Sequence, residues 1–370
     1  MARAPRATAK SMDMDIFQAS AAYERWLAGF MKPIAHDLRA KHKAMRKDAF
    51  TFFRATFYRW AQLWTSLPPD ITGAPAVAAI GDAHLENFGT WRDREGRLVW
   101  GVNDFDEATV APYTNDLVRV AVSGLLARDR GMVATSANSL FSALLGGYSA
   151  SLAHGGSPFV IEENNAWLRR LALNELRAPK RYWTKLAAIR PWRKRVPRRA
   201  AELLYRVPRD ASLLKVVHRL SGAGSLGRPR LAALFAWRGS YLAREVKARA
   251  PSAWLWANKA PLTGWKAILP EIWKRAVRCP DPGLKATGRW IVRRLAPDCS
   301  RIDMAELPRE RHERALFRAM GWEIANIHCG SPNVAAVRQH LGALDRHWLR
   351  DNALLMAAQL HREHRQWRAR

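Results

Sequence analysis

Two short stretches in the first third of the chain hold side chains that are suited to binding a metal ion and handling phosphate groups. One reads Ile-Gly-Asp-Ala-His-Leu-Glu-Asn-Phe-Gly at residues 80–89, and the other reads Val-Asn-Asp-Phe-Asp-Glu-Ala at residues 102–108. Each stretch follows a short apolar run, so a sheet would present its polar side chains at an edge. Oxygen donors suit Mg²⁺, which binds through one or two carboxylates together with substrate phosphates. The four donors are Asp82, Asn87, Asp104 and Asp106.

The spacing of these donors is that of a protein-kinase active site. Asp82 and Asn87 are five positions apart, which is the interval between the aspartate and the asparagine of the kinase catalytic loop. Asp104 follows Asp82 by 22 positions, and Asp104-Phe105 reproduces the first two residues of the metal-binding Asp-Phe-Gly motif. Asp106 replaces the glycine of that motif. Together the four residues predict a site for a metal ion and phosphates.

The same residues allow two other interpretations. Any single Asp or Asn in such a loop is more often a turn cap that bonds to nearby backbone than a ligand. The triplet Asp82-Ala83-His84 also opens metallophosphoesterase sites, but those need a later Gly-Asp and a Gly-Asn-His that the sequence lacks in that order. The combined order and spacing favour the kinase-like interpretation.

A second constellation lies further along the chain and predicts phosphate binding. The segment Gly222-Ala223-Gly224-Ser225-Leu226-Gly227 fits the pattern G-x-G-x-x-G, which occurs in both dinucleotide-binding folds and kinases. Here it lies between two strand-like runs, as in the kinase hairpin, whose glycines let backbone amides approach phosphates. Lys247 follows Gly227 by twenty positions on a third expected strand, where a kinase places its phosphate-binding lysine. An ordinary hairpin turn and a solvated lysine remain the alternatives.

The order of these motifs is the reverse of the order in kinases, where the glycine turn and the lysine come first. A fold is defined by packing in space, so joining the original termini and opening a new pair preserves a site. The sequence therefore predicts an α+β fold of two kinase-like lobes, circularly permuted, with a mostly helical lobe and a small antiparallel β lobe.

Hydrophobic periodicity supports this division. Strand patterns occur at 76–80, 98–102, 213–220, 230–237 and 241–248, and helical patterns at 13–66, 116–152, 310–328 and 334–366. The expected units are a helical lobe with the acidic motifs, a basic connecting segment, a β-rich lobe with the glycine turn and lysine, and C-terminal helices that pack on the first lobe. Their ranges are 1–153, 154–210, 211–300 and 301–370.

The composition suggests an intracellular protein that attracts polyanions. There are 61 Lys and Arg residues against 32 Asp and Glu, which gives a formal charge of +29. Residues 190–199 are six-tenths basic, and we expect them to be exposed, either contacting a polyanion or simply solvated. The three cysteines argue against a disulfide framework or a zinc site. The first twenty residues lack a signal-peptide core, and no apolar run is long enough for a membrane span, so we expect a cytoplasmic location.

Several consecutive segments resemble the bacterial "domain of unknown function 2252" family across nearly the whole chain. They include the acidic stretches and the glycine turn already described, together with Phe-Thr-Phe-Phe-Arg, Asn-Asp-Leu-Val-Arg, Glu-Val-Lys-Ala, Ile-Val-Arg-Arg-Leu and Glu-Ile-Ala-Asn-Ile-His. Their positions are 50–54, 115–119, 245–248, 291–295 and 323–328. This resemblance implies no substrate.

The acidic half is also similar to aminoglycoside and choline phosphotransferases, whose loop reads His-Gly-Asp-x-His-x-x-Asn. Ile80 stands here in place of the first histidine. The resemblance implies that Asp82 is the catalytic base and that His84 touches the moving phosphate. It also implies three metal ligands, a buried structural aspartate, and a helix that precedes the loop in those enzymes. These correspond to Asn87, Asp104 and Asp106, to Asp116, and to residues 323–328.

The leading functional hypothesis is ATP- and Mg²⁺-dependent phosphoryl transfer to an unidentified hydroxyl. Gly222, Gly224, Ser225, Gly227 and Lys247 would hold the phosphates, and Glu271 is the candidate to pair with Lys247. The first alternative is a nucleotide-binding pseudoenzyme that acts as a regulator. The second is a nucleic-acid or acidic-surface binder that uses residues 190–199, with some of the 17 tryptophans available for base stacking.

Overall fold

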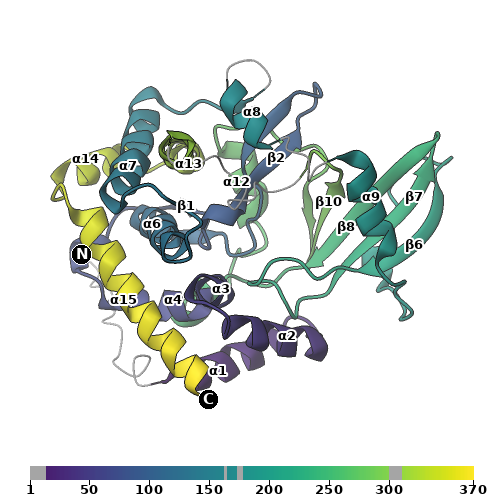
Figure 1. The fold of residues 1–370 in the computed structure, drawn as a ribbon, viewed down its shortest axis with the longest axis horizontal. Coiled ribbons are helices and arrows are strands. Elements are labelled where there is room, and N and C mark those ends of the chain that lie inside the picture. The colour runs from purple at the N-terminus through teal and green to yellow at the C-terminus, as the bar shows by residue number, and fades with distance from the viewer. Residues whose placement is uncertain (1–13, 162–164, 173–177, 300–310) are drawn as a thin grey trace.

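The computed structural model describes residues 14–161, 165–172, 178–299 and 311–370. It consists of a helical part and a five-stranded sheet beside it (Figure 1). Most of the residues from which the absence of a signal-peptide core was predicted lie outside the described part. The expected unit boundary at 300/301 and the expected start of a helix at residue 310 also lie outside it. No described helix is long and apolar enough to cross a membrane.

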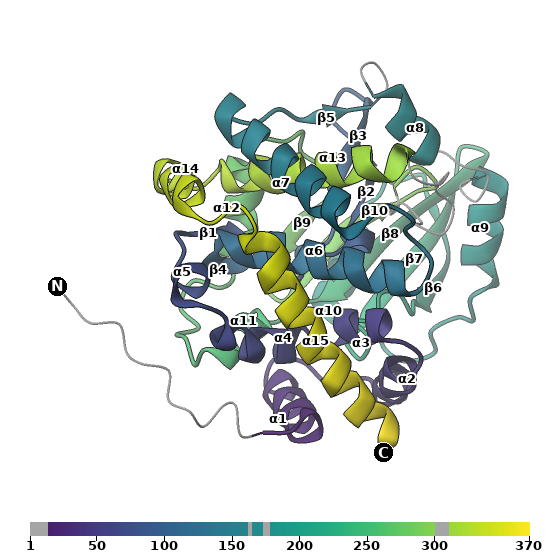
Figure 2. The ribbon, with the colours of Figure 1, turned by 60° about the vertical axis from the view of Figure 1, so that its left-hand side comes forward.

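The helical part brings together both ends of the described chain, as Figure 2 shows. The C-terminal helix α15 (Trp348–Ala369) packs along α6 (Tyr113–Asp129) and also contacts α1 and α3. Other helices of this part include α1 (Ile16–Ala28), α2 (Ala35–Met45), α3 (Ala49–Ala55), α4 (Phe57–Leu63) with the 3-10 turn η2 (Trp64–Ser66), α5 (Pro69–Thr72), α7 (Ala137–His154), α13 (Arg311–His328) and α14 (Val334–Ala343).

The helices α7 and α13 cross with their backbones in contact. A Cβ atom at Gly147 would lie 1.9 Å from the carbonyl oxygen of Arg318, and one at Gly321 would lie 1.9 Å from that of Leu144. Only glycine fits at these two positions, so the pair of glycines sets how closely α13 approaches the rest of the helical part. The core around them includes fully buried aromatic side chains, among them Trp60, Trp64, Trp100 and Phe317.

Two small sheets carry the acidic stretches. β1 (Ala76–Ala79) pairs with β4 (Thr109–Pro112), and β2 (Phe88–Arg92) pairs with β3 (Leu98–Val102), which also pairs with β5 (Phe159–Val160). All of these pairings are antiparallel. Residues 80–87 therefore leave the end of β1, and residues 103–108 leave the end of β3, as expected from the apolar runs that precede them.

The five-stranded sheet is antiparallel, with the strand order β6-β7-β8-β10-β9. Its alternating pattern buries Leu231, Ala233 and Val246 against α10 (Arg198–Leu204) on one face. On the other face, Ala232, Ala243 and Leu295 pack with Leu186 of α9 (Pro179–Ala188). The strands are β6 (Ser212–His218), β7 (Arg230–Trp237), β8 (Ser240–Ala248), β9 (Lys285–Thr287) and β10 (Trp290–Leu295).

The structure confirms the mixture of helices with small antiparallel sheets. Two of the predicted strands, 98–102 and 230–237, have the predicted bounds, and the other three lie within two residues of theirs. The helical patterns at 116–152 and 334–366 each form two helices, because the chain turns at Gly131 (φ +67°) and at residues 344–347. The segment 154–210 holds β5, α8 (Ala166–Ala172), α9 and α10.

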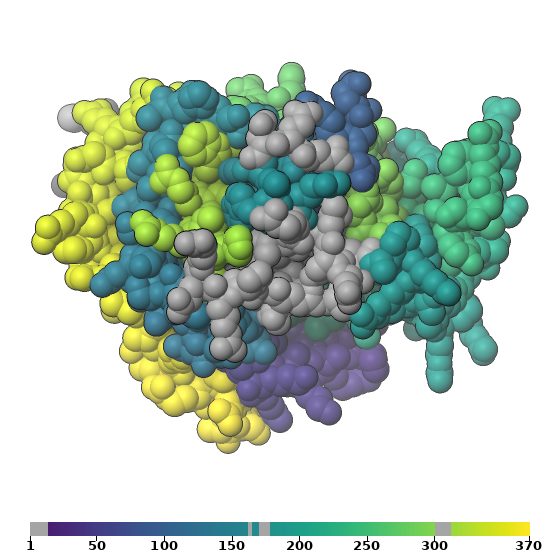
Figure 3. All heavy atoms as spheres, turned by 45° about the horizontal axis from the view of Figure 1, so that its top comes forward, coloured from purple at the N-terminus to yellow at the C-terminus, as the bar shows by residue number. Residues whose placement is uncertain are grey.

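Residues 190–199 are exposed as predicted. All six basic side chains of this run are exposed, whereas Trp192 and Val196 are half-buried. The run connects α9 to α10 at the side of the sheet, and Figure 3 shows the chain around α9 (teal) on the molecular surface. Its prolines, Pro191 and Pro197, keep it from continuing either helix.

Candidate functional site

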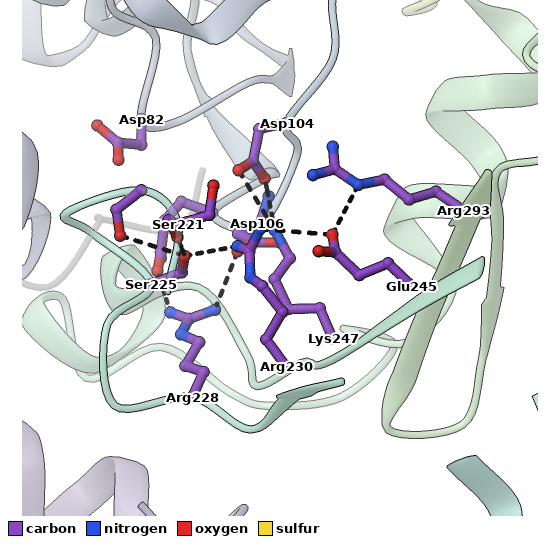
Figure 4. Close-up of polar contacts among 12 residues, drawn as sticks. Asp82, Asp104, Asp106, Ser221, Ser225, Arg228, Arg230, Glu245, Lys247 and Arg293 are labelled. Carbon is purple, nitrogen blue, oxygen red and sulfur yellow. Dashed lines mark hydrogen bonds and ion pairs between the residues drawn. The ribbon is translucent and has the colours of Figure 1, made fainter. Parts of the chain in front are cut away.

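A cavity of about 300 Å³ lies where the acidic stretches meet the glycine-rich turn of the sheet. Side chains from α1, α2, the loops after β1 and β3, and the inner face of the sheet line it. Figure 4 shows several of them directed toward a common space. Among the predicted residues, the cavity is lined by Asp82, His84, Asn87, Asp104, Asp106, Gly222, Gly224 and Ser225.

The position of Asp82 is fixed by the turn after β1. Gly81 has φ +80°, and a Cβ atom there would lie 2.2 Å from the carbonyl oxygen of Glu107, so the turn requires glycine. The buried Asp116 carboxylate accepts hydrogen bonds from the backbone N–H of Ile80 at 2.7 Å and of Gly81 at 3.0 Å. Asp116 thus holds the turn that carries Asp82, which is the structural role that the phosphotransferase resemblance implies.

The Asp82 carboxylate is held by Arg119, one turn further along the helix of Asp116. The Nε atom of Arg119 donates to Oδ1 of Asp82 at 2.8 Å. Burial raises the pKa of Asp82, and the charge of Arg119 opposes that shift. Sequence reasoning missed Arg119, although its spacing of three from Asp116 places both on one face of α6.

Asn87 joins the two acidic stretches. Its Nδ2 atom donates to the backbone carbonyl of Asp82 at 3.0 Å, and its Oδ1 atom accepts from the backbone N–H of Asp104 at 2.9 Å. The side chain is buried. Asn87 therefore fixes the loop that carries Asp82 against the segment of Asp104.

Lys247 lies directly against Asp104 and Asp106, as Figure 4 shows. Its Nζ atom is 3.0 Å from Oδ1 of Asp104 and 2.6 Å from Oδ1 of Asp106. Burial acts to raise the pKa of Asp104, but Lys247 and the arginines Arg230 and Arg293 lower it well below its usual range. Asp104 is thus an anion, and about two-fifths of its side chain is exposed to solvent (39%).

The glycine-rich turn approaches the acidic stretches closely at Gly224. A Cβ atom there would lie 2.8 Å from the carbonyl oxygen of Arg54 and 3.4 Å from Oδ2 of Asp82. Gly222 and Gly227 have φ of +75° and +95°, which favours glycine. Ser225 stabilises the turn, because its Oγ atom accepts from Nη2 of Arg230 at 2.7 Å and donates to the carbonyl of Ser221 at 3.0 Å.

The structure does not bring Glu271 to Lys247. Glu271 lies on α12 (Ile268–Arg275), where its half-exposed carboxylate accepts from Arg275 one turn along the same helix at 2.9 Å. The buried glutamate beside Lys247 is instead Glu245, two positions earlier on β8, so that both side chains lie on the inner face of the sheet. Strand periodicity is the signal that could have identified it.

His84 lines the cavity but acts locally as a cap. Its Nδ1 atom accepts the backbone N–H of Glu86 at 3.2 Å, at the start of the 3-10 turn η3 (Leu85–Asn87). Only 8% of the residue is exposed. This contact fixes the imidazole at the edge of the cavity next to Asn87.

The oxygen donors fit a magnesium ion that is held together with phosphates. Within the described part of the chain, no group of three or more His, Cys, Asp or Glu side chains could hold a metal ion. Magnesium does not need one, because it keeps several waters or phosphate oxygens among its ligands. Both carboxylate oxygens of Asp106 are buried and lack a well-directed hydrogen bond, although Lys247 lies close to one of them. Asn87, Asp104 and Asp106 are therefore the residues available to such an ion.

The cavity also contains cations that sequence reasoning did not single out. Lys41 on α2 is buried and lines the cavity, with its ammonium 5.3 Å from the centroid of the Tyr58 ring. Burial lowers the pKa of Lys41 to about 8. Arg228 is also buried and donates to Glu107 and Tyr23. Nothing in the spacing of these residues indicates the cavity, because they come from separate elements.

The helix α13, from the far end of the chain, contacts Asp116 and the second acidic stretch. His328 contacts Asp116, with its Nε2 atom 3.1 Å from the carboxylate, and its Nδ1 atom lies 2.9 Å from the hydroxyl of Tyr148. Glu323, one and a half turns earlier, accepts the backbone N–H of Val102 at 3.1 Å. Residues 323–328 thus lie beneath the ends of β1 and β3.

Comparison with family models gives one match, over the first part of the chain. Residues 34–178 match the family model described as an uncharacterized protein conserved in bacteria (DUF2252). The match includes the acidic stretches and Asp116 but ends before the glycine-rich turn and Lys247. It agrees over this range with the resemblance found from the sequence segments. No curated protein and no solved structure matches the chain.

Proposed function

We propose that the chain is a phosphotransferase that uses ATP and Mg²⁺ to phosphorylate a hydroxyl group, and that its fold is a circularly permuted kinase-like fold. The observation that carries this proposal is the contact of Lys247 with Asp104, 143 positions apart in the sequence, together with the approach of Gly224 to Asp82. The two halves of the motif set meet in one cavity, even though their order along the chain is reversed.

The arrangement of the sheet supports the same assignment. The glycine-rich turn joins the first two strands of the five-stranded sheet, and Lys247 lies on the third. A kinase places its glycine-rich loop over the phosphates and its phosphate-binding lysine on the third strand. Backbone amides of residues 222–227 and the Lys247 ammonium would therefore hold the phosphates of the nucleotide.

Each acidic residue then has a defined role. Asp82 orients or deprotonates the acceptor hydroxyl, and Arg119 keeps its carboxylate in place. Asn87, Asp104 and Asp106 supply oxygen ligands for Mg²⁺. When bound, Mg²⁺ would neutralise the negative charge that develops on the phosphates during transfer. Lys247 would then pair with the phosphates as well as with the carboxylates it contacts here.

The test is nucleotide binding by calorimetry, with and without Mg²⁺. We expect the wild type to bind ATP only weakly without Mg²⁺. Asp104→Ala should abolish the Mg²⁺-dependent gain, because it removes the main anionic ligand of the ion. Lys247→Met should weaken binding in both conditions, since it removes a phosphate contact. If Asp104→Ala bound MgATP as tightly as the wild type, the metal site and the proposed function would both be wrong.

A regulatory pseudoenzyme is the second candidate, and one observation favours it. Asp106 stands where kinases have a glycine, and it forms a closer ion pair with Lys247 (2.6 Å) than Asp104 does (3.0 Å). This pairing competes with phosphate for the lysine. Incubation with radiolabelled ATP, mixed acceptors and Mg²⁺ separates the candidates: binding without transfer to water, protein or small molecules supports the regulator.

A further inference from the structure

Most cations around the cavity pair with one or two carboxylates. Each of these buried charges is compensated locally, as burial of a charge requires. These pairs are Arg54 with Glu86, Arg119 with Asp82, Arg228 with Glu107 and Asp106, and Lys247 with Asp104 and Asp106.

Glu245 is different, because it is shared by three arginines. Its carboxylate accepts from Nη1 of Arg219, from Nη1 of Arg230 at 3.4 Å and from Nε of Arg293 at 2.8 Å. Arg219 follows β6 directly, Arg230 begins β7, and Arg293 lies in the middle of β10. The pKa of Glu245 is held well below its usual range: burial acts to raise it, but the three arginines and Lys247 outweigh burial. The single carboxylate of Glu245 therefore pairs with three guanidinium groups on the inner face of the sheet.

Arg219 and Arg293 are the two arginines of this cluster whose side chains are partly exposed. Arg230 is only 3% exposed. Its Nη1 atom donates to Glu245 and its Nη2 atom donates to Ser225, so both terminal nitrogens have an acceptor within the protein. Arg219 and Arg293 line the cavity, with 21% and 26% of their side chains exposed. In the described part of the chain, the only acceptor we find for either guanidinium is Glu245. Figure 4 shows the terminal nitrogens of Arg293 directed toward Asp104 and the cavity, away from Glu245.

The geometry points to a second anion-binding subsite formed by Arg219 and Arg293, and we propose that the acceptor is a small molecule that already carries a phosphate group. Guanidinium groups fit phosphate oxygens with paired N–H donors. The inference rests on the proposed function for its assignment of the nucleotide phosphates to Lys247 and the glycine-rich turn. The phosphate of the acceptor would bind in the same cavity, next to Arg219 and Arg293.

The experiment titrates inorganic phosphate into the full chain at fixed ionic strength, without nucleotide or Mg²⁺, and records tryptophan fluorescence or heat. We expect saturable binding in the wild type. Arg219→Gln and Arg293→Gln should each weaken it about tenfold or more, because each removes charge-assisted hydrogen bonds. Arg195→Gln removes the same charge from the exposed run at 190–199 and should leave the affinity within twofold.

Two further measurements test the subsite: phosphate titrations of lysine variants, and a phosphate titration in the presence of MgADP. Arg219→Lys and Arg293→Lys retain the charge and the ion pair with Glu245, so they serve if a Gln variant fails to fold, and they should bind phosphate more weakly than the wild type. The titration is then repeated with saturating MgADP, where phosphate binding should persist.

Three results would overturn the inference: no saturable binding, Arg293 variants that bind like Arg195→Gln, or loss of phosphate binding in the presence of MgADP. The nucleotide experiment is independent of this one. Failure of phosphate binding with intact MgATP binding would reject the subsite alone. Phosphate binding without any Mg²⁺-dependent nucleotide binding would reject the proposed function.

Discussion

The carboxylate of Asp82 lies beside the glycine-rich turn, and its orientation depends on a single arginine. Arg119 is fully buried and contacts three aromatic rings, Phe53, Phe57 and Trp60, within 4.0–4.9 Å of their centroids. These rings fix the guanidinium, which in turn fixes Asp82. A carboxylate held in this way needs little reorganisation when a substrate binds.

The first prediction concerns Asp82 itself. Asp82→Asn keeps the volume and can still bond to Arg119, so the affinity for MgATP should stay within about threefold. Turnover should fall by ~10² or more, the usual contribution of a positioned acid–base group. Calorimetry and a phosphoryl-transfer assay on the same preparation measure the two effects. Equal turnover in the variant and the wild type would remove Asp82 from the chemistry.

The second prediction concerns the charge of Glu245. Because its pKa is lowered on folding from the ordinary value of 4.5, its stabilisation is complete above that value and is lost as the pH falls below it. Glu245→Gln leaves three arginines without their carboxylate and should lower the free energy of unfolding at pH 7 by about 3–5 kcal/mol. The difference between variant and wild type should shrink below pH 4.5.

Urea unfolding between pH 7 and pH 3 measures this difference. Glu202→Gln is the control, since Glu202 is exposed and pairs with Arg198 and Arg199 on the surface of α10. It should change stability little at any pH. A Glu245→Gln effect that stays constant down to pH 3 would contradict the ionic role of Glu245.

At the scale of elements, α13 contacts the end of β3 directly and supports the turn after β1 through Asp116. The third prediction is that Asp116→Ala destabilises the fold by about 3–5 kcal/mol, because it leaves two buried backbone N–H groups and His328 without their acceptor. Thermal and urea unfolding measure the loss. Asp351→Ala, which removes an exposed carboxylate on α15, is the matched control. Equal effects of the two changes would contradict the role of Asp116.

The elements themselves were largely predictable, since alternation and helical periodicity are local properties of the sequence. The strands at 98–102 and 230–237 had the predicted bounds because turn residues flank them. The breaks within 116–152 and 334–366 were missed, because a short turn interrupts the apolar pattern only slightly. Short elements such as α11 (Ala253–Ala257) and β9 carry too few residues for a period to be recognised.

The site was predictable only where its residues are close in sequence. Asp82, Asn87, Asp104 and Asp106 lie within 25 residues of one another, just after β1 and β3. Glu245 and its three arginines come from different strands, and β10 lies between β8 and β9, an order that local sequence does not encode. The choice of Glu271 was wrong for the same reason: α12 could be recognised, but its direction relative to Lys247 depends on tertiary packing.

At the scale of the whole molecule, the charge of +29 and the exposed run at 190–199 bear on binding to polyanions. The fourth prediction is that replacing Arg193, Lys194 and Arg195 by serine makes the dependence of log affinity on log salt less steep by about 2–3, for a double-stranded DNA probe. The matched control replaces Arg362, Arg365 and Arg368, which are exposed on α15. Equal changes of the salt dependence in both variants would show that DNA binding depends on the total charge of the protein and not on residues 190–199 in particular.

The contact between His328 and Asp116 joins positions 212 apart, and this has a consequence for synthesis on the ribosome. At ~5–20 residues per second, roughly 10–40 s pass between the emergence of Asp116 and that of its partner. During that interval α13 is not yet available to the turn of Asp82. The contacts of His328 with Asp116 and of Glu323 with Val102 have therefore not formed. Nascent chains stalled after residue 299 should therefore leave this turn open to proteases, whereas chains released after residue 330 should protect it.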